Sequence, residues 1–251
     1  MSRVILLTGV TGKFGRVFLE HLLELGHSVI GTASKAESME KLIDELGLSE
    51  KRFYGVVVDL CETDGVHGLL SELNEKHLYP DCLINNARSL DFLHVDQNGI
   101  VSRANFLNEY LLDVVVPYEL GMNLKNYSEN LNLIINIGSQ YGVVAANTTL
   151  YDDPWTESPI HYSIAKAGLV HLTKELAVRL ADGNVQVNCI AYGGVAGRTT
   201  KAFQERYSKM LPLGRMLNEH EIVWPVEILL GGNSAPISGQ TLNFDGGWTI
   251  W

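Results

Sequence analysis

The sequence predicts an α/β protein built from βαβ repeats. Short apolar runs recur along the chain and are separated by amphipathic helical patterns, the alternation expected of a parallel sheet. The first run, Val4 to Leu7, is apolar throughout, as in a strand that is buried on both faces. With 251 residues, of which 46% are hydrophobic, the chain fits one large domain spanning residues 1–251.

Composition narrows the classes of partner. The net charge of -10, with no stripe rich in lysine and arginine, argues against nucleic acid or an anionic membrane. No apolar stretch approaches the ~20 residues of a membrane span, and the first is too short for a signal peptide. The cysteines Cys61, Cys82 and Cys189 lack paired spacing and are expected to be buried free thiols, which favours a reducing, cytoplasmic compartment. The eight histidines show no ligand spacing, so no metal site is expected.

A glycine-rich turn follows the first strand and opens an amphipathic helix that ends near Leu25, before Gly26. Strand, turn and helix in this order bring backbone N–H groups and a positive helix terminus to a place where a pyrophosphate binds. The alternative is a tight turn without a ligand. The predicted dinucleotide contacts in this segment are Thr8, Gly9, Thr11, Gly12, Lys13, Phe14 and Gly15.

The second strand, Ser28 to Thr32, lacks an acidic residue at its end. In dinucleotide-binding proteins, an Asp or Glu at this point holds the ribose 2′-OH of NAD. Here the chain has Ala33, Ser34 and Lys35 instead. Because a hydroxyl and an ammonium suit a 2′-phosphate, the sequence favours NADP, with NAD as second choice. The alternative is that Lys35 merely begins the helix expected over residues 36–46.

The third and fourth strands end in polar residues at the edge of the sheet where ligands bind. The third is expected over Val56–Leu60, and Asp59, next to Leu60, is suited to accept a hydrogen bond from an adenine amino group. The fourth, Cys82–Ala87, contains Asn86 before Ala87. Asparagines after a buried strand are also common turn formers. The predicted cofactor contacts here are Asp59, Leu60, Asn86 and Ala87.

Tyr162 and Lys166 lie four residues apart in a helical pattern that runs to about Leu180, so both side chains address the same volume. A fixed cation favours the phenolate, and a phenol tuned in this way can exchange a proton with a substrate oxygen. By themselves the two residues also fit an ordinary helix surface. A fifth strand, Leu131–Ser139, ends in the hydroxyl of Ser139.

The ordered set of these motifs resembles the short-chain dehydrogenase/reductase superfamily over the whole chain. The set comprises T-G-x-x-G-x-x-G from Thr8, Asp59, Asn85-Asn86-Ala87, Ser139 and the Y-x-x-x-K of Tyr162 and Lys166. The resemblance implies a single-domain Rossmann fold with a doubly wound, seven-stranded parallel sheet and helices on both faces. It also implies an NAD(P)(H)-dependent oxidoreductase that interconverts a carbonyl and a secondary alcohol.

The same resemblance assigns catalytic roles. Tyr162 is the acid/base, Lys166 tunes it and binds ribose hydroxyls, and Ser139 polarises the substrate oxygen. Asp113, in a helical stretch expected over residues 101–126, stands where the family usually has an asparagine that relays protons. Arg88 replaces the usual glycine after the Asn-Asn-Ala motif, a change that narrows the cofactor cleft.

The segment after the sixth strand, expected over residues 185–190, lies against the nicotinamide carboxamide in this family. Tyr192 stands there in place of a proline. Residues 198–210 are expected to form the helix that covers the substrate, and residues 239–247 the seventh strand and closing turn. Family members commonly form dimers or tetramers through their last strands, so a homo-oligomer with Trp248–Trp251 in a subunit contact is expected. The predicted cofactor contacts in this half are Tyr162, Lys166, Tyr192, Gly193, Gly194 and Val195.

An insertion at residues 147–159 is expected above the nicotinamide end of the cleft. It is acidic and aromatic, and long connections of this kind are often lids; the alternative is a solvated loop anchored by Trp155. Trp155 and Tyr141 are the predicted substrate contacts, with Trp155 stacking on a sugar ring.

The stretch from residue 137 through the insertion resembles a subgroup of flagellin-modification and nonulosonate-pathway oxidoreductases, which implies a small, polar or sugar-like substrate. A 3-oxoacyl-reductase-like enzyme and a non-catalytic, cofactor-binding regulator are the alternatives.

Overall fold

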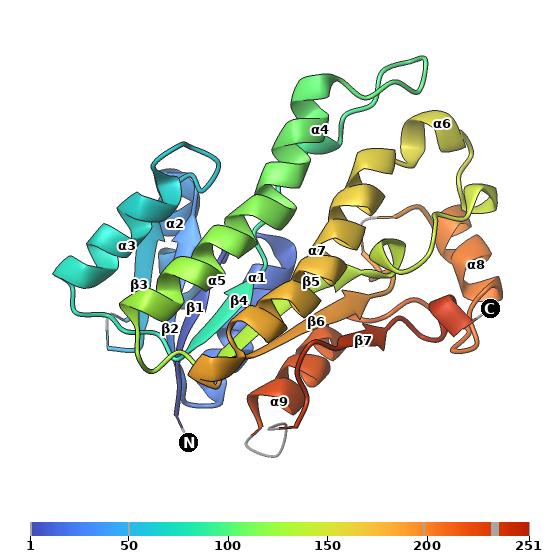
Figure 1. Cartoon of the computed structure of the whole chain (residues 1–251). Helices are drawn as coiled ribbons and strands as arrows, with labels where there is room; N and C mark the ends of the chain where they lie inside the picture. Colours follow the sequence, from blue (N-terminus) through green and yellow to red (C-terminus); the bar gives the residue numbers. More distant parts are fainter. Residues whose placement is uncertain (1, 50, 198, 232–235, 251) are drawn as a thin grey trace.

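Parallel strands from the whole length of the chain join in one sheet. The computed structural model describes residues 2–49, 51–197, 199–231 and 236–250. Within them the sheet has seven strands in the order β3-β2-β1-β4-β5-β6-β7, so the direction of winding reverses between β1 and β4 (Figure 1). The strands are β1 (Val4–Leu7), β2 (Ser28–Ala33), β3 (Phe53–Val57), β4 (Cys82–Asn85), β5 (Leu133–Ser139), β6 (Gln186–Tyr192) and β7 (Thr241–Phe244). A reversal of this kind opens a crevice at the carboxyl ends of the strands.

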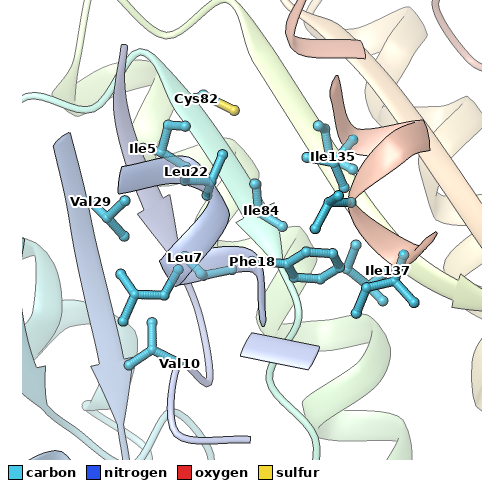
Figure 2. Packing of buried hydrophobic residues seen from close by; sticks show 14 of the residues in the cluster. Ile5, Leu7, Val10, Phe18, Leu22, Val29, Cys82, Ile84, Ile135 and Ile137 are labelled. Carbon is cyan, nitrogen blue, oxygen red and sulfur yellow. The ribbon is translucent and has the colours of Figure 1, made fainter. Parts of the chain in front are cut away.

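Helices cover both faces of the sheet, as the resemblance implied. The helices are α1 (Lys13–Glu24), α2 (Ala36–Leu46), α3 (Gly65–Glu75), α4 (Arg103–Tyr110), α5 (Val116–Tyr127), α6 (Pro154–Glu157), α7 (Ile160–Arg179), α8 (Lys201–Lys209) and α9 (Trp224–Leu230). Successive side chains of β1 point to opposite faces. Ile5 and Leu7 lie in the same buried cluster as Phe18 of α1 (Figure 2), whereas Leu6 lies in the cluster on the other face, with Leu120 of α5. The first face is covered by α1, α2 and α9, and the second by α3, α5 and α7.

The third strand differs from its predicted bounds. It begins at Phe53 and ends at Val57, where it pairs with Ala33 of β2. The apolar run suggested a strand buried on both sides, but β3 is an edge strand and Val57 is 48% exposed. Asp59 lies beyond the strand and its carboxylate accepts a hydrogen bond from the Cys61 backbone, which turns the chain away from the sheet.

The long helical stretch predicted over residues 101–126 is not one continuous α-helix. Between α4 and α5 the backbone forms a π-helical segment, Leu111–Val115, that contains Asp113. Such widened turns inside helices frequently occur at functional sites.

The cysteines also differ in part from expectation, since Cys82 and Cys189 are buried but Cys61 is only partly buried. All three are free thiols.

A separate aromatic cluster lies beyond the carboxyl ends of β5 and β6, where Figure 1 shows α6 and α8. Trp248 stacks on Tyr207 of α8, with ring centroids 4.6 Å apart and an interplanar angle of 8°. Trp248 is therefore buried within its own chain, whereas Ile250 is 70% exposed and Trp251 lies outside the described residues. In the part of the chain that is described, no helix combines the length and the apolar character needed to cross a bilayer.

Candidate functional site

A cleft of about 790 Å³ runs along the carboxyl ends of the strands. It brings together residues that lie far apart in the sequence. Of the predicted cofactor contacts, all except Thr8 line it: Gly9, Thr11, Gly12, Lys13, Phe14, Gly15, Ser34, Lys35, Asp59, Leu60, Asn86, Ala87, Tyr162, Lys166, Tyr192, Gly193, Gly194 and Val195. Ser139 and Tyr141 line the same cleft. Asp113 and Trp155 do not belong to its lining.

The glycine turn is shaped by close backbone contacts. Gly9 adopts a φ of +69°, and a Cβ there would lie 2.7 Å from the Ala87 Cα. A Cβ on Gly15 would lie 2.1 Å from the Gly9 carbonyl oxygen, so α1 packs directly on the turn. Gly12 is the N-cap of α1 and provides no side-chain cap, and the first turn has no acidic residue. The free N–H groups at this helix terminus fit the phosphates of a dinucleotide.

Thr8 supports this turn from behind. Its hydroxyl oxygen accepts hydrogen bonds from the backbone N–H groups of Asn86 and Ala87, both at 2.9 Å. The Asn86 amide in turn donates to the Thr8 carbonyl oxygen at 2.9 Å and to that of Gly9 at 3.2 Å. Thr8 is buried, and the Asn86 side chain ties the end of β4 to the glycine turn. Both side chains thus fix the shape of the cleft wall.

Lys13 and Tyr192 connect the two halves of the cleft. The Lys13 ammonium donates to the Ala196 carbonyl oxygen at 2.7 Å and forms an ion pair with Glu219 at 2.8 Å. The Tyr192 side chain is buried in the core and donates its hydroxyl to the Ile222 carbonyl oxygen. Residues 192–195 line the cleft, and the Tyr192 ring packs against Phe14 of α1, with ring centroids 5.4 Å apart.

One end of the cleft is formed by β2, and this strand contains no acidic residue. Ala33, which ends β2, is buried but lines the cleft, and Ser34 and Lys35 are exposed beside it. Asp59 is exposed on the neighbouring loop. This end therefore offers a hydroxyl and an ammonium next to one another.

The candidate catalytic residues gather at the other end. Ser139 ends β5 and accepts a hydrogen bond from the Tyr141 backbone at 3.2 Å. The Lys166 ammonium lies 5.8 Å from the centre of the Tyr162 ring. Lys166 is buried and donates to Asp113 Oδ1 and to the Ile137 carbonyl oxygen, both at 3.0 Å. Burial alone lowers the pKa of Lys166, but attraction to Asp113 and Tyr162 outweighs burial and raises it, so the ammonium stays charged.

A second, small cavity of about 10 Å³ lies behind the ion pair and is lined by Asp113, Lys166 and Asn85. Within the described residues, Asp113 Oδ2 and Asn85 Oδ1 are buried without a hydrogen-bond partner. Unpaired buried oxygens are costly, and a cavity of this size holds about one water molecule. The arrangement is therefore suited to one bridging water.

Glu109 is a buried acid that the sequence analysis did not identify. It is 1% exposed, and neither carboxylate oxygen has a hydrogen-bond partner among the described residues. Burial raises the pKa of Glu109 to about 7, and the charge of Asp113 adds to this increase. The spacing of four residues between Glu109 and Asp113 was the available signal, because such a pair shares one side of a helix.

Aromatic and polar groups surround the candidate catalytic residues. The Arg88 guanidinium lies 4.8 Å from the centre of the Tyr162 ring. The Tyr141 and Tyr151 hydroxyls are 2.9 Å apart, and burial raises the pKa of Tyr141, so this pair stays neutral. Tyr207 donates to the buried Gln140 at 2.6 Å and thereby joins α8 to the end of β5.

The insertion at residues 147–159 is attached to α8. The Arg206 side chain donates to the Leu150 carbonyl oxygen at 2.8 Å and pairs with Asp152 at 3.0 Å. Leu150 is fully buried. Trp155 is 77% exposed and packs near Gly99, away from the cleft lining, so its predicted stacking on a substrate stays a prediction. The helix that was predicted over residues 198–210 to cover the substrate is α8, which begins at Lys201; Arg198 lies outside the described residues.

Comparisons with known proteins agree with this geometry. Residues 3–208 match the family model described as short chain dehydrogenase. The chain is 28% identical over 255 residues to the 3-oxoacyl-[acyl-carrier-protein] reductase FabG of Vibrio harveyi, covering 98% of this chain and 97% of that protein. It is 25% identical over 258 residues to the post-translational flagellin modification protein A of Campylobacter coli, covering 99% of each.

A solved structure gives the same answer for the fold. A short chain dehydrogenase from Leptospira borgpetersenii with bound NAD+ matches with a TM-score of 0.83 and 27% identity, over 100% of this chain and 94% of that one. With the sheet order, the glycine turn and the Ser139, Tyr162 and Lys166 arrangement in place, the chain belongs to the short-chain dehydrogenase family.

Proposed function

We propose that the protein is an NAD(P)(H)-dependent oxidoreductase that interconverts a carbonyl and a secondary alcohol. The observation that carries the proposal is that Ser139, Tyr162 and Lys166 line the same cleft as the glycine turn. Family membership supports it, and so does the NAD+ bound to the Leptospira structure. The free N–H groups at the start of α1 suit the phosphates of such a cofactor.

The bound nicotinamide would supply or accept the hydride at the substrate carbon. In the direction of reduction, Tyr162 donates its phenolic proton to the carbonyl oxygen, while the Ser139 hydroxyl donates a hydrogen bond to that oxygen. Lys166, held by Asp113, stabilises the phenolate that remains. In the direction of oxidation, the phenolate takes the proton from the alcohol.

NADP is our first choice of cofactor and NAD the second. Ser34 and Lys35 are exposed next to the end of β2, where they can donate to a 2′-phosphate. No acidic side chain stands at the end of that strand to repel it. Titration of the purified protein with NADPH and, separately, NADH, followed by tryptophan quenching, tests this choice. Tighter binding of NADH would mean that Ser34 and Lys35 do not contact the ribose.

We propose a polar, sugar-like substrate. The Tyr141 and Tyr151 hydroxyls, Arg88 and the polar insertion surround the reacting end of the cleft. The similarity to the flagellin modification protein of Campylobacter coli supports this class, whereas the similarity to FabG keeps a 3-oxoacyl substrate as the second candidate.

The expected working form is a homo-oligomer in the cytoplasm, and sedimentation analysis of the purified protein tests the assembly.

Replacing Tyr162 with phenylalanine tests the mechanism. We expect Tyr162→Phe to lose about 10²–10⁴-fold in turnover of a keto-sugar panel while still binding cofactor, because only the acid/base hydroxyl is removed. Tyr118→Phe is the matched control, since Tyr118 is 46% exposed on α5. Unchanged turnover in Tyr162→Phe would defeat the mechanism. Cofactor binding without turnover of any carbonyl by the parent protein would favour the regulatory alternative.

A further inference from the structure

Glu109 is a buried carboxyl group for which the proposed mechanism has no use. It lies in the last turn of α4, next to the π-helical segment that carries Asp113. It is 1% exposed, and both of its carboxylate oxygens are buried without a hydrogen-bond partner in the described part of the chain. An ionised carboxylate is very costly in such a place unless it is paired, whereas a protonated one is tolerated.

The charged and titratable groups around Glu109 come from four elements. Asp113 follows on the π-helical segment, Lys166 faces it from α7, Arg88 from the loop after β4 and Cys61 from the loop after β3. The attraction of Lys166 and Arg88 is outweighed by burial and by Asp113, which is why the pKa of Glu109 rises to about 7. His161 of α7 packs against Phe106, which lies one helical turn before Glu109 on α4.

Lys166 already has a carboxylate partner. Its ammonium is 3.0 Å from Asp113 Oδ1, and this pair balances one positive charge with one negative charge. A second carboxylate in the same buried volume would leave one net negative charge, because the guanidinium of Arg88 is exposed and makes no hydrogen bond to Glu109 in the described structure. Glu109, which has no hydrogen-bond partner in the described structure, therefore retains its proton.

We propose that Glu109 is a positioning residue whose carboxyl group carries a proton beside Asp113 and Lys166, and that loss of this proton sets an alkaline limit to turnover at Tyr162. This inference rests on the proposed function. While the proton is held, the positive charge of Lys166 acts fully on the Tyr162 phenolate. When the proton leaves to solvent, Glu109 becomes a carboxylate, draws Lys166 electrostatically towards the two acids and disfavours the phenolate.

Infrared spectroscopy tests the protonation without any substrate. The carbonyl stretch of a protonated carboxyl group should be present at pH 5.5 and disappear as the pH passes about 7. The titrating band should be missing from Glu109→Gln but unchanged in Glu75→Gln, because Glu75 is an exposed acid at the end of α3. A carboxyl band that disappears only in the ordinary acidic range would overturn the proposal.

Asp113→Asn provides a second variant should Glu109→Gln fail to fold. Removing the Asp113 charge leaves Lys166 free to pair with Glu109, so the carboxyl band should disappear at lower pH than in the parent protein. An unchanged midpoint would contradict an effect of the Asp113 charge on the Glu109 proton.

The effect on turnover is measured as kcat at saturating cofactor and carbonyl substrate between pH 5.5 and 8.5. We expect a several-fold fall in kcat centred near pH 7 in the parent protein and in Glu75→Gln, and no such fall in Glu109→Gln. A fall that persists in Glu109→Gln would overturn the role of Glu109. Absence of turnover in every protein would count against the proposed function alone, because the infrared titration would still decide the protonation.

Discussion

The two ends of the cleft are built by different physical means. At the end that contains the glycine turn, Gly15 closely approaches the Gly9 carbonyl oxygen and Gly9 closely approaches the Ala87 backbone, so the shape depends on missing side chains. At the end with the candidate catalytic residues, Asp113 and Lys166 are 53 residues apart in the sequence and meet as buried charges. The first end should therefore respond to added volume, and the second to added or removed charge.

The largest expected effect tests the charge-dependent end. Lys166→Met should lower the free energy of unfolding by about 3–5 kcal/mol, because Asp113 would be left as an unpaired buried carboxylate. Denaturant unfolding at pH 7.5 measures it. Lys41→Met, at a lysine whose side chain is 74% exposed, is the control and should change stability by less than about 0.5 kcal/mol. Equal losses of unfolding free energy in both variants would show that the ion pair between Lys166 and Asp113 does not contribute to stability.

The second effect is the pH dependence of stability from Glu109. Folding raises its pKa from 4.5 to about 7, so the protonated form is favoured in the folded state. Its contribution is fully present below about pH 4.5 and is lost as the pH rises through 7, by at most about 3 kcal/mol. Unfolding titrations from pH 4.5 to 8 should show this decline in the parent protein relative to Glu109→Gln. A constant difference between the two proteins would rule out the shifted titration.

The third effect tests the volume-dependent end. Gly15→Ala should destabilise the protein by about 1–3 kcal/mol and weaken cofactor binding, because the new methyl group would lie 2.1 Å from a backbone oxygen that cannot rotate away. Gly68→Ala is the matched control: this helical glycine of α3 has nothing within 4 Å of an added Cβ. It should gain up to about 1 kcal/mol from helix propensity. Thermal unfolding and cofactor titration distinguish the two variants.

The smallest effect concerns the choice of cofactor. Ala33→Asp should shift the ratio of affinities for NADH and NADPH by about 10-fold towards NADH, or ~1.4 kcal/mol, since a carboxylate accepts from a 2′-OH and repels a 2′-phosphate. Ala33→Asn adds nearly the same volume without charge and should shift the ratio much less. A shift of the same size in both variants would assign the effect to added volume, whereas the expected difference between them would show that charge also matters at this end of the cleft.

The sequence by itself predicted βαβ repeats and most of the cleft lining, while the family resemblance implied the seven-stranded sheet. Apolar periodicity marked the strands, and the glycine turn, Asn86, Ser139, Tyr162 and Lys166 were identified by local motifs. These features could be predicted because each has a local sequence motif, although Asn86 also joins β4 to the glycine turn in the structure. The bounds of β3 were wrong because an apolar run does not reveal which strand lies at the edge of the sheet.

Only the tertiary structure decided what surrounds the motifs. It placed Trp155 outside the cleft lining, Arg88 over the Tyr162 ring and Glu109 in a buried volume beside Asp113. The sequence places Glu109, one of 29 acidic residues, four residues before Asp113, but this spacing does not show that its carboxyl group is buried. Burial and charge pairing arise where elements from distant parts of the chain pack together, and those two properties govern the energy of an ionisable group.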